Sequence, residues 1–505
     1  MNAHRPLPRL HRLPQALYRA KQVRELDRLA IERYGIPGEV LMERAGQAAF
    51  EVLERRWPEA GRIVVLAGTG NNGGDGFVLA RLALQAGKRV RVLQLGDPAR
   101  ISGDARTHAD RFAALSGEWQ PFDGRVPGNA DLLVDAIFGT GLERPVEGAW
   151  AEAIEAMNRS RVPVLALDLP SGLHADTGAV LGTAVRAQAT VTFIGLKQGM
   201  FTGEGPDCCG EVEFDALEVP ARLYGHLVVS ARRIDWAQQR ELLQPRRATA
   251  HKGDFGHVLV VGGDHGMGGA ARLAAEAALR TGAGLVSLAT RPEHLAPVLA
   301  TRPEIMVHGV EAPEQLDSLL RRATQVVVGP GLGRDAWGRA LFEMVLAAGR
   351  PLVVDADGLN LLAEAPVQRD DWVLTPHPGE AARLLGTDAA GIQADRFAAA
   401  ERLRSKLGGV VVLKGAGTLV ASGGDRRPAV CSDGNPGMAS GGMGDVLAGV
   451  VAGLLAQGMA PCVASEMGVC LHAAAADKAA RAGRRGLLAM DLMSHVRRLA
   501  NPDNE

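Results

Sequence analysis

The chain has 505 residues, and 56 Lys and Arg against 57 Asp and Glu leave a formal net charge of −1 at pH 7. This balance argues against a protein that binds nucleic acid or anionic membranes through bulk charge. Hydrophobic residues make up 47% of the chain and charged residues 22%, as in a globular protein. Aromatic residues are only 4%, which disfavours a platform that stacks single-stranded nucleic acid.

Glycine is over-represented, with 63 of the 505 residues, or about 12% against ~7% in average proteins. No G-X-Y period accompanies it, which excludes collagen. The glycines cluster between apolar runs, where a chain needs positive φ or brings its backbone close to a ligand. These clusters therefore mark the segments in which binding sites are expected.

The cysteines and the N-terminal segment indicate the compartment. The five cysteines have no C-x-x-C spacing, which predicts reduced thiols in a cytoplasmic protein. The N-terminal segment is basic and interrupted by prolines, and it has no apolar stretch of the kind found in signal peptides. No apolar run approaches the roughly 18 residues of a membrane-spanning helix, so we expect no membrane contact.

The first half of the chain alternates apolar strands with helical stretches. Leu41–Arg56 has apolar residues at helical spacing and predicts a helix. The strands that follow are almost continuously hydrophobic, as expected for parallel strands buried on both faces and joined by crossover helices. The predicted strands are Ile63–Ala67, Val90–Leu95, Leu132–Ile137, Val162–Leu167, Ala189–Ile194 and Val212–Phe214.

The alternation stops after Phe214. Val219–Ala250 contains prolines and an Arg-rich segment but no glycine-capped strand, so we expect a domain boundary near residues 225–235. A second alternation follows and ends with two packed helices, Val446–Leu455 and Ser465–Ala480. Its predicted strands are Val258–Val261, Leu285–Ala289, Val326–Val328, Leu352–Val354, Val373–Leu374 and Val410–Leu413. The sequence therefore predicts an α/β protein of two fused domains.

The first glycine-rich motif is GTGNNGGDG, which lies between the strand Ile63–Ala67 and a helical segment, Phe77–Ala86. Small residues at a helix start expose backbone N–H groups where the helix dipole favours a phosphate. The motif is not GxGxxG and has no acidic partner near residue ~88, which disfavours a plain Rossmann dehydrogenase. The alternative is a tight turn without a ligand, although two asparagines and an aspartate are unusual in a mere turn.

Two further motifs of the first half, VDAIFGTGLERP and LDLPSGLHADTG, also follow strands. Asp135, Asp168 and Ser171 stand at the strand ends. Because ligands bind at the carboxyl ends of parallel strands, we expect these residues to converge on Asn72. Carboxylate, amide and hydroxyl oxygens suit an alkali cation better than a thiolate-seeking metal. The alternative is that the two aspartates only cap helices.

NPGMASGGMGDVLAGV is the most specific motif of the second half. Gly441–Gly444 precede an apolar helix and can present several N–H groups to a phosphate. Asp445 at the helix start is then placed to take a proton from a hydroxyl beside that phosphate, as phosphoryl transfer requires. The alternative is a helix-capping carboxylate. No Walker A sequence occurs, so a P-loop kinase is not supported.

Three other segments support a phosphate site in the second half. Lys414 in VLKGAGTLV follows a strand, where its charge can neutralise phosphate oxygens, and Thr418 adds a hydroxyl donor. His377 in VLTPHPGE lies between two prolines that direct it to the same edge, and Asp355 and Asp357 in VVDADGLN follow another strand. The alternative for a single histidine is a structural or surface position.

With GTGNNGGDG, DAIFGTGLERP and DLPSGLHADTG, the first half resembles NAD(P)H-hydrate epimerase, which implies a Rossmann-like α/β/α sandwich. With HKGDFGHVLVVGG, VVDADGLN, LTPHPGE, LKGAGT and GGMGD, the second half resembles the ADP-dependent NAD(P)H-hydrate dehydratases, which implies a ribokinase-like α/β domain. Together they resemble the bifunctional bacterial repair enzymes over nearly the whole chain, with implied domains 20–228 and 229–500. Residues before about 20 fall outside the resemblance, so we expect an untethered extension there.

For the epimerase domain, the resemblance implies a K⁺ ion held by Asn72, Asp135 and Ser171, with Asp168 as the acid or base at the nicotinamide end. Trp150 is a further expected contact. The residues implied to line the hydrated dinucleotide are Asn71, Asn72, Gly73, Gly74, Asp75, Gly139, Thr140, Gly141, Leu142, Glu143, Arg144 and Pro145.

For the dehydratase domain, the resemblance implies that Asp445 takes the proton of the hydrate hydroxyl while a phosphoryl group arrives. The residues implied to bind ADP are Lys414, Gly415, Ala416, Gly417, Thr418 and Gly444, and those implied to contact the hydrate are Ala271, Gly331, Gly333, His377 and Asp445. Mg²⁺ is expected to bridge the nucleotide phosphates, although the sequence reveals no dedicated carboxylate cage for it.

The implied substrates are NADH-hydrate and NADPH-hydrate, with ADP converted to AMP and phosphate, and neither nucleic acid nor membrane as a partner. We expect the chain to form a homo-oligomer. Two rival functions stay open at this point. One is a small-molecule kinase of the ribokinase class fused to an unrelated nucleotide-binding module, and the other makes the first domain a sensor that binds its ligand without turnover.

Overall fold

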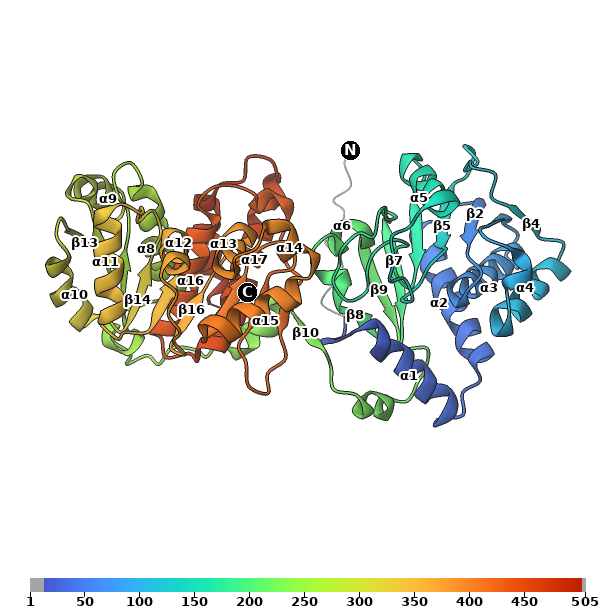
Figure 1. The fold of residues 1–505 in the computed structure, drawn as a ribbon, viewed down its shortest axis with the longest axis horizontal. Helices are drawn as coiled ribbons and strands as arrows, with labels where there is room; N and C mark the ends of the chain where they lie inside the picture. Colours follow the sequence, from blue (N-terminus) through green and yellow to red (C-terminus); the bar gives the residue numbers. More distant parts are fainter. Residues whose placement is uncertain (1–12, 502–505) are drawn as a thin grey trace. The chain divides into compact units, whose positions relative to one another are not determined.

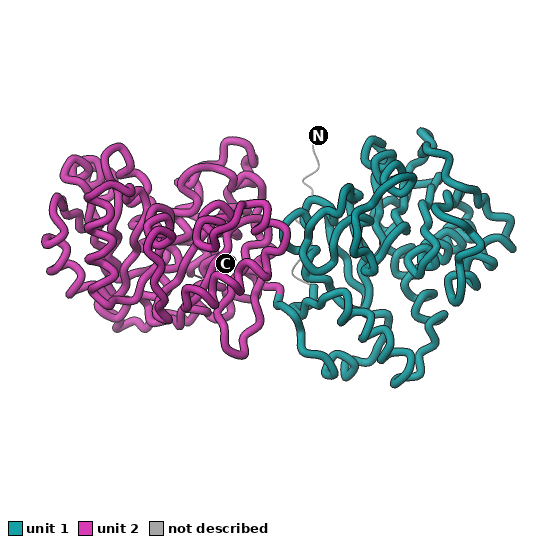
Figure 2. The backbone as a smooth tube through the Cα atoms, viewed as in Figure 1, with its two compact units in different colours: residues 1–232 teal, residues 233–505 magenta. Residues whose placement is uncertain are grey.

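The computed structural model describes residues 13–501. The chain forms two compact units, Met1–Arg232 (unit 1) and Arg233–Glu505 (unit 2), each shown in its own colour in Figure 2. Each unit contains a largely parallel sheet with helices packed against it (Figure 1). The predicted two-domain α/β organisation is confirmed at this level.

The main sheet of unit 1 has seven strands, all parallel, in the order β4-β3-β2-β5-β6-β7-β9. Their bounds are β2 (Arg62–Ala67), β3 (Arg89–Gln94), β4 (Glu118–Pro121), β5 (Leu132–Ala136), β6 (Val164–Leu167), β7 (Ala189–Phe193) and β9 (Glu211–Asp215). All six predicted strands are confirmed within two residues. The edge strand β4 was not predicted because its sequence, EWQP, contains no apolar run.

Alternation along the strands buries both faces of this sheet. In β2, Ile63 and Val65 pack into a core with helices α2 to α4, whereas Val64 and Leu66 pack into a second core with α5 (Figure 1). This double burial is the physical reason for the continuous apolar runs. The helices of unit 1 are α1 (Ala20–Glu32), α2 (Gly38–Arg56), α3 (Asn71–Gln85), α4 (Gly103–Ala114), α5 (Gly148–Arg159) and α6 (Gly205–Cys209).

The glycine-rich motif after β2 is helical rather than a loop, because α3 already begins at Asn71. A Cβ on Gly73 would lie 2.1 Å from the carbonyl oxygen of Gly68, and one on Gly74 would lie 2.5 Å from the sulfur of Met42. No side chain fits at either position. These two glycines therefore let the first turn of α3 pack closely against its neighbours.

The expected untethered extension before residue 20 is wrong for the part that the structure describes; residues 1–12 lie outside that part. Strand β1 (Ala16–Tyr18) pairs antiparallel with β10 (Ala231–Ile234) and parallel with β8 (Leu196–Lys197). Leu17 and Tyr18 are buried, so the segment is anchored by both pairing and packing. Strand β10 lies in the stretch Val219–Ala250, for which no glycine-capped strand was predicted, and its short sequence, ARRI, indeed has no glycine cap.

The sheet of unit 2 runs in the order β13-β12-β11-β14-β15-β16-β17-β18-β19. Strands β11 to β17 pair parallel, and β18 and β19 add two antiparallel strands. The bounds are β11 (His257–Val261), β12 (Leu285–Thr290), β13 (Met306–Gly309), β14 (Gln325–Val328), β15 (Leu352–Val354), β16 (Trp372–Leu374), β17 (Val410–Leu413), β18 (Leu419–Ala421) and β19 (Ala429–Cys431). All six predicted strands are confirmed, and the short β13, β18 and β19 were not predicted.

The core of unit 2 gathers α8, α16, α17 and α18 against the sheet. A Cβ on Gly449 of α16 would lie 2.1 Å from the carbonyl oxygen of Ala274 in α8, so these helices approach closely only because residue 449 is glycine. The two helices predicted near the end of the chain are confirmed as α16 and α17. The helices are α7 (Trp236–Gln239), α8 (Gly268–Thr281), α9 (Leu295–Thr301), α10 (Asp317–Arg322), α11 (Ala336–Ala347), α12 (Ala356–Glu364), α13 (Pro378–Leu385), α14 (Ala389–Ala394), α15 (Arg396–Leu407), α16 (Met443–Ala456), α17 (Pro461–Ala479) and α18 (Leu492–Leu499).

Within residues 13–501, no helix is both long and apolar enough to cross a membrane.

Candidate functional site

A cavity of about 1010 Å³ lies at the carboxyl edge of the unit 1 sheet. Such an edge is the usual ligand site of open α/β sheets. Most of the residues predicted to line the dinucleotide reach this cavity, but Gly73 and Gly74 are packed inside the fold. The predicted residues that line it are Asn71, Asn72, Asp75, Gly139, Thr140, Gly141, Leu142, Glu143, Arg144, Pro145, Trp150 and Asp168.

Asn72, Asp135 and Ser171 come together beside this cavity, as predicted. The Ser171 hydroxyl and backbone N–H donate to the two carboxylate oxygens of Asp135 at 2.6 and 2.7 Å. The backbone N–H of Phe138 donates to the Ser171 hydroxyl at 2.8 Å, and Asn72 Nδ2 donates to the Phe138 carbonyl at 2.9 Å. One continuous hydrogen-bonded chain therefore joins α3 to the ends of β5 and β6.

The donor set of this cluster suits a hard cation. Asp135 is fully buried, and burial raises its pKa to about 6, although hydrogen bonds from Ser171 oppose the shift. Asn72 Oδ1 is buried and receives no hydrogen bond from any residue in the range 13–501. An unpaired buried oxygen is costly, and a cation would satisfy it together with the carboxylate and the hydroxyl.

Asp168 stands at the cavity wall just after β6. Its φ of 62° is left-handed, a conformation that aspartate tolerates better than most residues but that still stores strain. The ammonium of Lys197, itself fully buried, forms an ion pair with Asp168 Oδ1 and donates to the Thr192 hydroxyl at 2.7 Å. A Cβ on Gly139 would lie 3.2 Å from Asp168 Oδ2, so the segment after β5 and the segment after β6 come into contact here.

The sequence analysis missed Asp27, which lines the cavity, and Lys197, which is buried and pairs with Asp168. Asp27 comes from α1, far from the recognisable motifs, and Lys197 lies in an apolar segment, so only the tertiary fold brings them to Asp168. Burial, and then the charge of Asp168, raise the pKa of Asp27 to about 7 and hold the pKa of Asp75 well above its usual range. Three carboxyl groups thus share one buried ammonium.

Trp150 lines the same cavity beside Phe138. The two rings lie 4.8 Å apart between centroids with an interplanar angle of 34°. An aromatic pair at a cavity wall offers a flat apolar surface to a planar ligand ring. The expected ligand contact of Trp150 stays a prediction.

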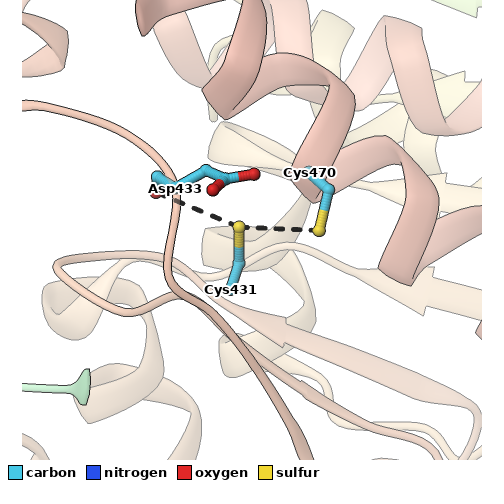
Figure 3. Close-up of side chains that lie close together, drawn as sticks. All are labelled: Cys431, Asp433 and Cys470. Atoms are coloured by element: carbon cyan, nitrogen blue, oxygen red, sulfur yellow. Dashed lines mark hydrogen bonds between the residues drawn. The ribbon is translucent and has the colours of Figure 1, made fainter. Parts of the chain in front are cut away.

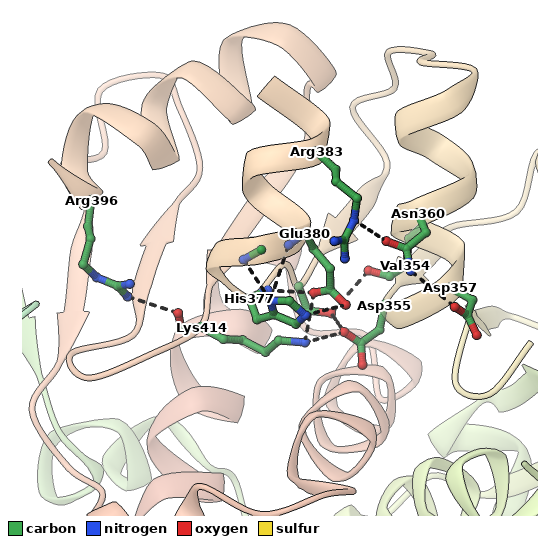
Figure 4. Close-up of polar contacts among 11 residues, drawn as sticks. Val354, Asp355, Asp357, Asn360, His377, Glu380, Arg383, Arg396 and Lys414 are labelled. Atoms are coloured by element: carbon green, nitrogen blue, oxygen red, sulfur yellow. Dashed lines mark hydrogen bonds and ion pairs between the residues drawn. The ribbon is translucent and has the colours of Figure 1, made fainter. Parts of the chain in front are cut away.

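In unit 2, charged side chains converge at the carboxyl edge of the sheet (Figure 4). Lys414 Nζ, just after β17, lies 2.6 Å from Asp355 Oδ1 and 3.7 Å from Glu380 Oε2. The Thr375 hydroxyl donates to Asp355 Oδ1 at 2.8 Å. Burial disfavours the charge on Lys414, but the charges of Asp355 and Glu380 outweigh it and raise its pKa. Glu380 was not singled out from the sequence, although it lies inside LTPHPGE.

The GGMGD motif joins this charged group. Gly442 adopts a φ of 88°, which suits glycine, and α16 then begins at Met443. A Cβ on Gly444 would lie 3.2 Å from Lys414 Nζ and 3.6 Å from Asp355 Oδ2. Asp445 lies in the first turn, where burial and the neighbouring charge of Asp355 raise its pKa to about 7. The motif, the lysine and three carboxyl groups therefore form one site.

His377 has a structural task that its motif alone does not reveal. Its Nδ1 accepts hydrogen bonds from the backbone N–H groups of Gly379 at 2.9 Å and Glu380 at 3.3 Å, which caps α13. Glu380 Oε2 in turn accepts from the His377 N–H at 2.7 Å. Burial and the charge of Lys414 lower the pKa of His377, so the ring that faces the site is neutral.

The Lys414–Thr418 loop is held from beneath by Arg396, which the sequence analysis did not identify. Arg396 is fully buried at the start of α15, and its guanidinium donates to the carbonyl oxygens of Leu413 and Lys414, each at 3.2 Å (Figure 4). A third carbonyl, that of Gly417, lies 3.5 Å away. The geometry fixes the backbone of the loop rather than offering a charge to solvent.

The other predicted hydrate contacts lie among glycine turns of unit 2. Ala271 is fully buried, with its Cβ close to where side chains at Gly262 and Gly263 would begin. The Gly333 N–H donates to Asp357 Oδ2 at 3.0 Å, and Gly331 adopts a φ of 58°. The ligand contacts of Ala271, Gly331 and Gly333 stay predictions.

Cys431, Asp433 and Cys470 form a separate cluster, with donor atoms all within 4.8 Å of one another (Figure 3). The Cys470 thiol points at Cys431 Sγ at 3.6 Å, and Asp433 Oδ2 accepts the Trp236 N–H at 2.6 Å. Burial holds the pKa of Cys470 well above its usual range, so the thiol stays protonated and disfavours metal binding. The cluster is therefore a packed interior contact.

Comparison with known families divides the chain in the same way. Residues 258–498 match the family model described as NAD(P)H-hydrate dehydratase, and residues 38–199 match the model described as YjeF-related protein N-terminus. Asp27 lies before the range 38–199, and the GGMGD motif lies inside the range 258–498.

Two curated relatives match nearly end to end. The bifunctional NAD(P)H-hydrate repair enzyme Nnr of Coxiella burnetii is 50% identical over 96% of this chain and 99% of its own, and that of Escherichia coli is 44% identical over 97% and 95%. A solved ribokinase-like superfamily protein from Enterococcus faecalis is 30% identical, with a TM-score of 0.51 over 54% of this chain and 96% of its own. The chain therefore belongs to the family of bifunctional NAD(P)H-hydrate repair enzymes.

Proposed function

We propose that the protein restores hydrated NADH and NADPH. Unit 1 interconverts the R and S epimers at C6 of the nicotinamide ring, and unit 2 dehydrates the S epimer with ADP as phosphoryl donor, giving AMP and phosphate. The observation that carries the proposal is the partly buried Lys414 between Asp355 and Glu380, beside Gly444 and within reach of the charge of Asp445. This arrangement unites a cation, an anion-binding helix start and a base.

In the dehydratase reaction, the C6 hydroxyl attacks the terminal phosphoryl group of ADP while Asp445 takes its proton. A pKa of about 7 suits a base that works near neutral pH. Lys414 and the N–H groups at the start of α16 offset the charge on the phosphoryl oxygens. The phosphate then leaves C6 with the bonding pair, and loss of a proton from C5 restores the ring double bond.

Lys414, Gly415, Ala416, Gly417, Thr418 and Gly444 are proposed to bind ADP. Arg396 donates to the carbonyls of Leu413, Lys414 and Gly417 and so holds the backbone of this loop in position for the nucleotide. Ala271, Gly331, Gly333 and His377 are proposed to contact the hydrate. A neutral His377 ring can accept or donate a hydrogen bond without adding charge.

Asp355 and Glu380 are the carboxylates proposed to hold Mg²⁺, and both lie beside the partly buried Lys414. Oxygen ligands of this kind, completed by substrate phosphates, are what Mg²⁺ prefers. When bound, the ion would neutralise the nucleotide phosphates.

In unit 1, K⁺ is proposed to lie among Asn72, Asp135 and Ser171. The unpaired Asn72 Oδ1 and the buried Asp135 carboxylate support an oxygen-ligated cation of low charge. When bound, the ion would offset the Asp135 charge and fix the rim of the cavity. Asp168, which forms an ion pair with Lys197 at the cavity wall, is then the group that takes a proton from the reacting water or hydroxyl.

The functional domains are proposed to be residues 20–228 and 229–500. The protein is proposed to act in the cytoplasm without nucleic acid and to assemble as a homo-oligomer. Light scattering of the purified protein measures its oligomeric state. A monomer at micromolar concentration would contradict it.

The function is tested by supplying purified R and S hydrates separately to the full chain with Mg²⁺ and either ADP or ATP. We expect the S hydrate to regain the near-ultraviolet absorbance of the reduced cofactor with ADP, and the R hydrate to follow after epimerisation. A stable phosphorylated product without recovered cofactor would identify a kinase instead. Binding of both hydrates with an unchanged epimer ratio would make unit 1 a sensor.

A further inference from the structure

Helix α1 forms a wall of the unit 1 cavity, although it precedes the family match at residues 38–199. Its first N–H, that of Ala20, donates to Asp176 Oδ1 at 2.7 Å, which anchors the helix start. A Cβ on Gly195 would lie 3.3 Å from Val23 and 3.4 Å from Leu26, so α1 packs directly over the backbone two residues before Lys197. This packing fixes Asp27 at the cavity, close to the buried ammonium.

The charges at this end of the cavity are unbalanced. Lys197 pairs with Asp168, whereas the carboxyl groups of Asp27 and Asp75 have no ion pair or hydrogen bond within residues 13–501. One ammonium cannot neutralise three carboxylates in a partly buried space, so protons must be shared among them. Asp168 is the member of the three that forms an ion pair with the lysine.

We propose that Asp27 is a second general acid–base residue of the epimerase centre and works as the acid opposite Asp168, which acts as the base. The proposal rests on the epimerase function proposed above and adds a catalytic residue to it. The two groups come from separate elements, α1 and the end of β6, and both line the cavity. Inversion at C6 requires an acid and a base at the same time, and this pair provides them.

The reaction balances with these two groups alone. Asp27 gives its proton to the C6 hydroxyl, the C6–O bond breaks, and water leaves with the bonding pair. The lone pair of ring nitrogen N1 forms an N1=C6 double bond, giving an iminium cation beside two carboxylates. Water then adds to the other face of C6, its proton passes to Asp168, and the N1=C6 pair returns to nitrogen. Proton exchange with solvent resets the pair.

Asp27 suits this task better than Asp75. Burial raises the pKa of Asp27 to about 7, where a carboxyl group gives and regains a proton readily at neutral pH, whereas the pKa of Asp75 lies well above its usual range. The groups that act on Asp27 are Asp75 of α3, Asp168 after β6 and Lys197 of β8. The other charged residues lining the cavity are Arg24, Arg100, Asp104, Glu143, Arg144 and Glu147.

The test compares Asp27→Asn, Asp27→Glu and the surface control Glu25→Gln, on the same helix, in the full chain. Epimerisation is followed from R hydrate, and dehydration of S hydrate with ADP measures the integrity of the second unit. We expect Asp27→Asn to lower kcat for epimerisation by about 10²-fold. Asp27→Glu should recover part of this rate, and Glu25→Gln should epimerise at the wild-type rate. Dehydration stays at the wild-type rate in all three.

The pH profile separates chemistry from packing. In wild type, kcat/KM for epimerisation falls as pH rises through about 7 because Asp27 loses its proton, and Asp27→Asn lacks this fall. A wild-type rate in Asp27→Asn, or a lowered rate with an unchanged pH profile, overturns the proposal. A wild-type protein that does not epimerise at all would instead overturn the proposed function of unit 1, so the two failures are distinct.

Discussion

At the residue scale, each unit contains an aspartate whose surroundings suit a different task. Asp168 forms an ion pair with Lys197 in unit 1, whereas burial and the Asp355 charge raise the pKa of Asp445 to about 7 in unit 2. Substitution at either aspartate should therefore remove one activity and spare the other.

Asp168→Asn keeps the size of the side chain and tolerates the left-handed backbone, but removes the charge that pairs with Lys197. We expect epimerisation to fall by about 10²-fold or more and dehydration of S hydrate to be unchanged. Measurement of both rates on one preparation checks this. Equal loss of the two activities would contradict the division of labour between the units.

Asp445→Asn should lower dehydration by about 10²-fold or more, because no base then takes the hydroxyl proton. In wild type, kcat/KM for dehydration should rise with pH through about 7 as Asp445 ionises. This change is opposite in direction to the fall in kcat/KM for epimerisation that is expected when Asp27 loses its proton. A pH series of initial rates with S hydrate and ADP measures it. Flat dehydration rates between pH 5 and 8 would refute Asp445 as the base.

The sequence predicts well where polar residues at strand ends lie, because a polar side chain that directly follows a buried strand is placed at the edge of the sheet. Asn72, Asp135 and Ser171 meet as expected for that reason. It cannot predict Asp27, whose contribution depends on how α1 packs over Gly195.

At the element scale, the groups of the unit 2 site lie in a loop and in the first turn of a helix, and each of these elements depends on a contact elsewhere in the unit. The Lys414–Thr418 loop depends on one guanidinium below it. Helix α16, which carries Asp445, depends on a glycine contact with α8. Both supports can be tested without touching a group that contacts substrate.

Arg396→Met should free the Lys414–Thr418 loop, because the carbonyls of Leu413 and Lys414 lose their shared donor. We expect KM for ADP to rise about tenfold, with epimerisation unaffected. Arg402→Met, at an exposed position of the same helix, is the control and should behave as wild type. An unaltered KM in Arg396→Met would mean that the loop holds its shape unaided.

Gly449→Ala places a methyl group 2.1 Å from the Ala274 carbonyl and should force α8 and α16 apart. We expect a loss of about 1–3 kcal/mol in the free energy of unfolding of unit 2, as for other overpacked interiors. Urea unfolding followed by circular dichroism measures the change. Gly269→Ala on α8, where a Cβ meets open space, should leave stability the same or slightly raised.

Strands could be predicted from the sequence where both of their faces are buried. Strands β2 and β5 are buried on both faces and were found from continuous hydrophobicity, whereas β4 and β10 have polar or short sequences that carry no such signal. Their positions follow from pairing with neighbours, which a local pattern does not contain.

At the scale of the whole molecule, the chain joins two activities that complete each other. A dehydratase specific for the S epimer leaves the R epimer behind, and the epimerase returns it to the reaction. Asp168→Asn supplied with an equal mixture of hydrates should therefore convert only the S share rapidly, whereas wild type converts all of it. Chiral separation of the remaining hydrate measures the difference, and complete rapid conversion by the variant would contradict it.

Replacement of K⁺ by a bulky organic cation should lower epimerisation and leave dehydration at its normal rate, because only unit 1 has the Asn72, Asp135 and Ser171 cluster. Both rates are measured in matched ionic strength. An effect confined to dehydration would show that the cation acts elsewhere.

The pairing of β1 and the placement of α1 bear on how the protein is dissected for study. A shortened version designed to begin at residue 38, where the recognisable family match starts, would omit both elements. It would discard Asp27 and expose the apolar patch that Val23 and Leu26 normally cover. Such a fragment would not report the activity of unit 1 reliably, and a version that begins at residue 13 or earlier avoids the problem.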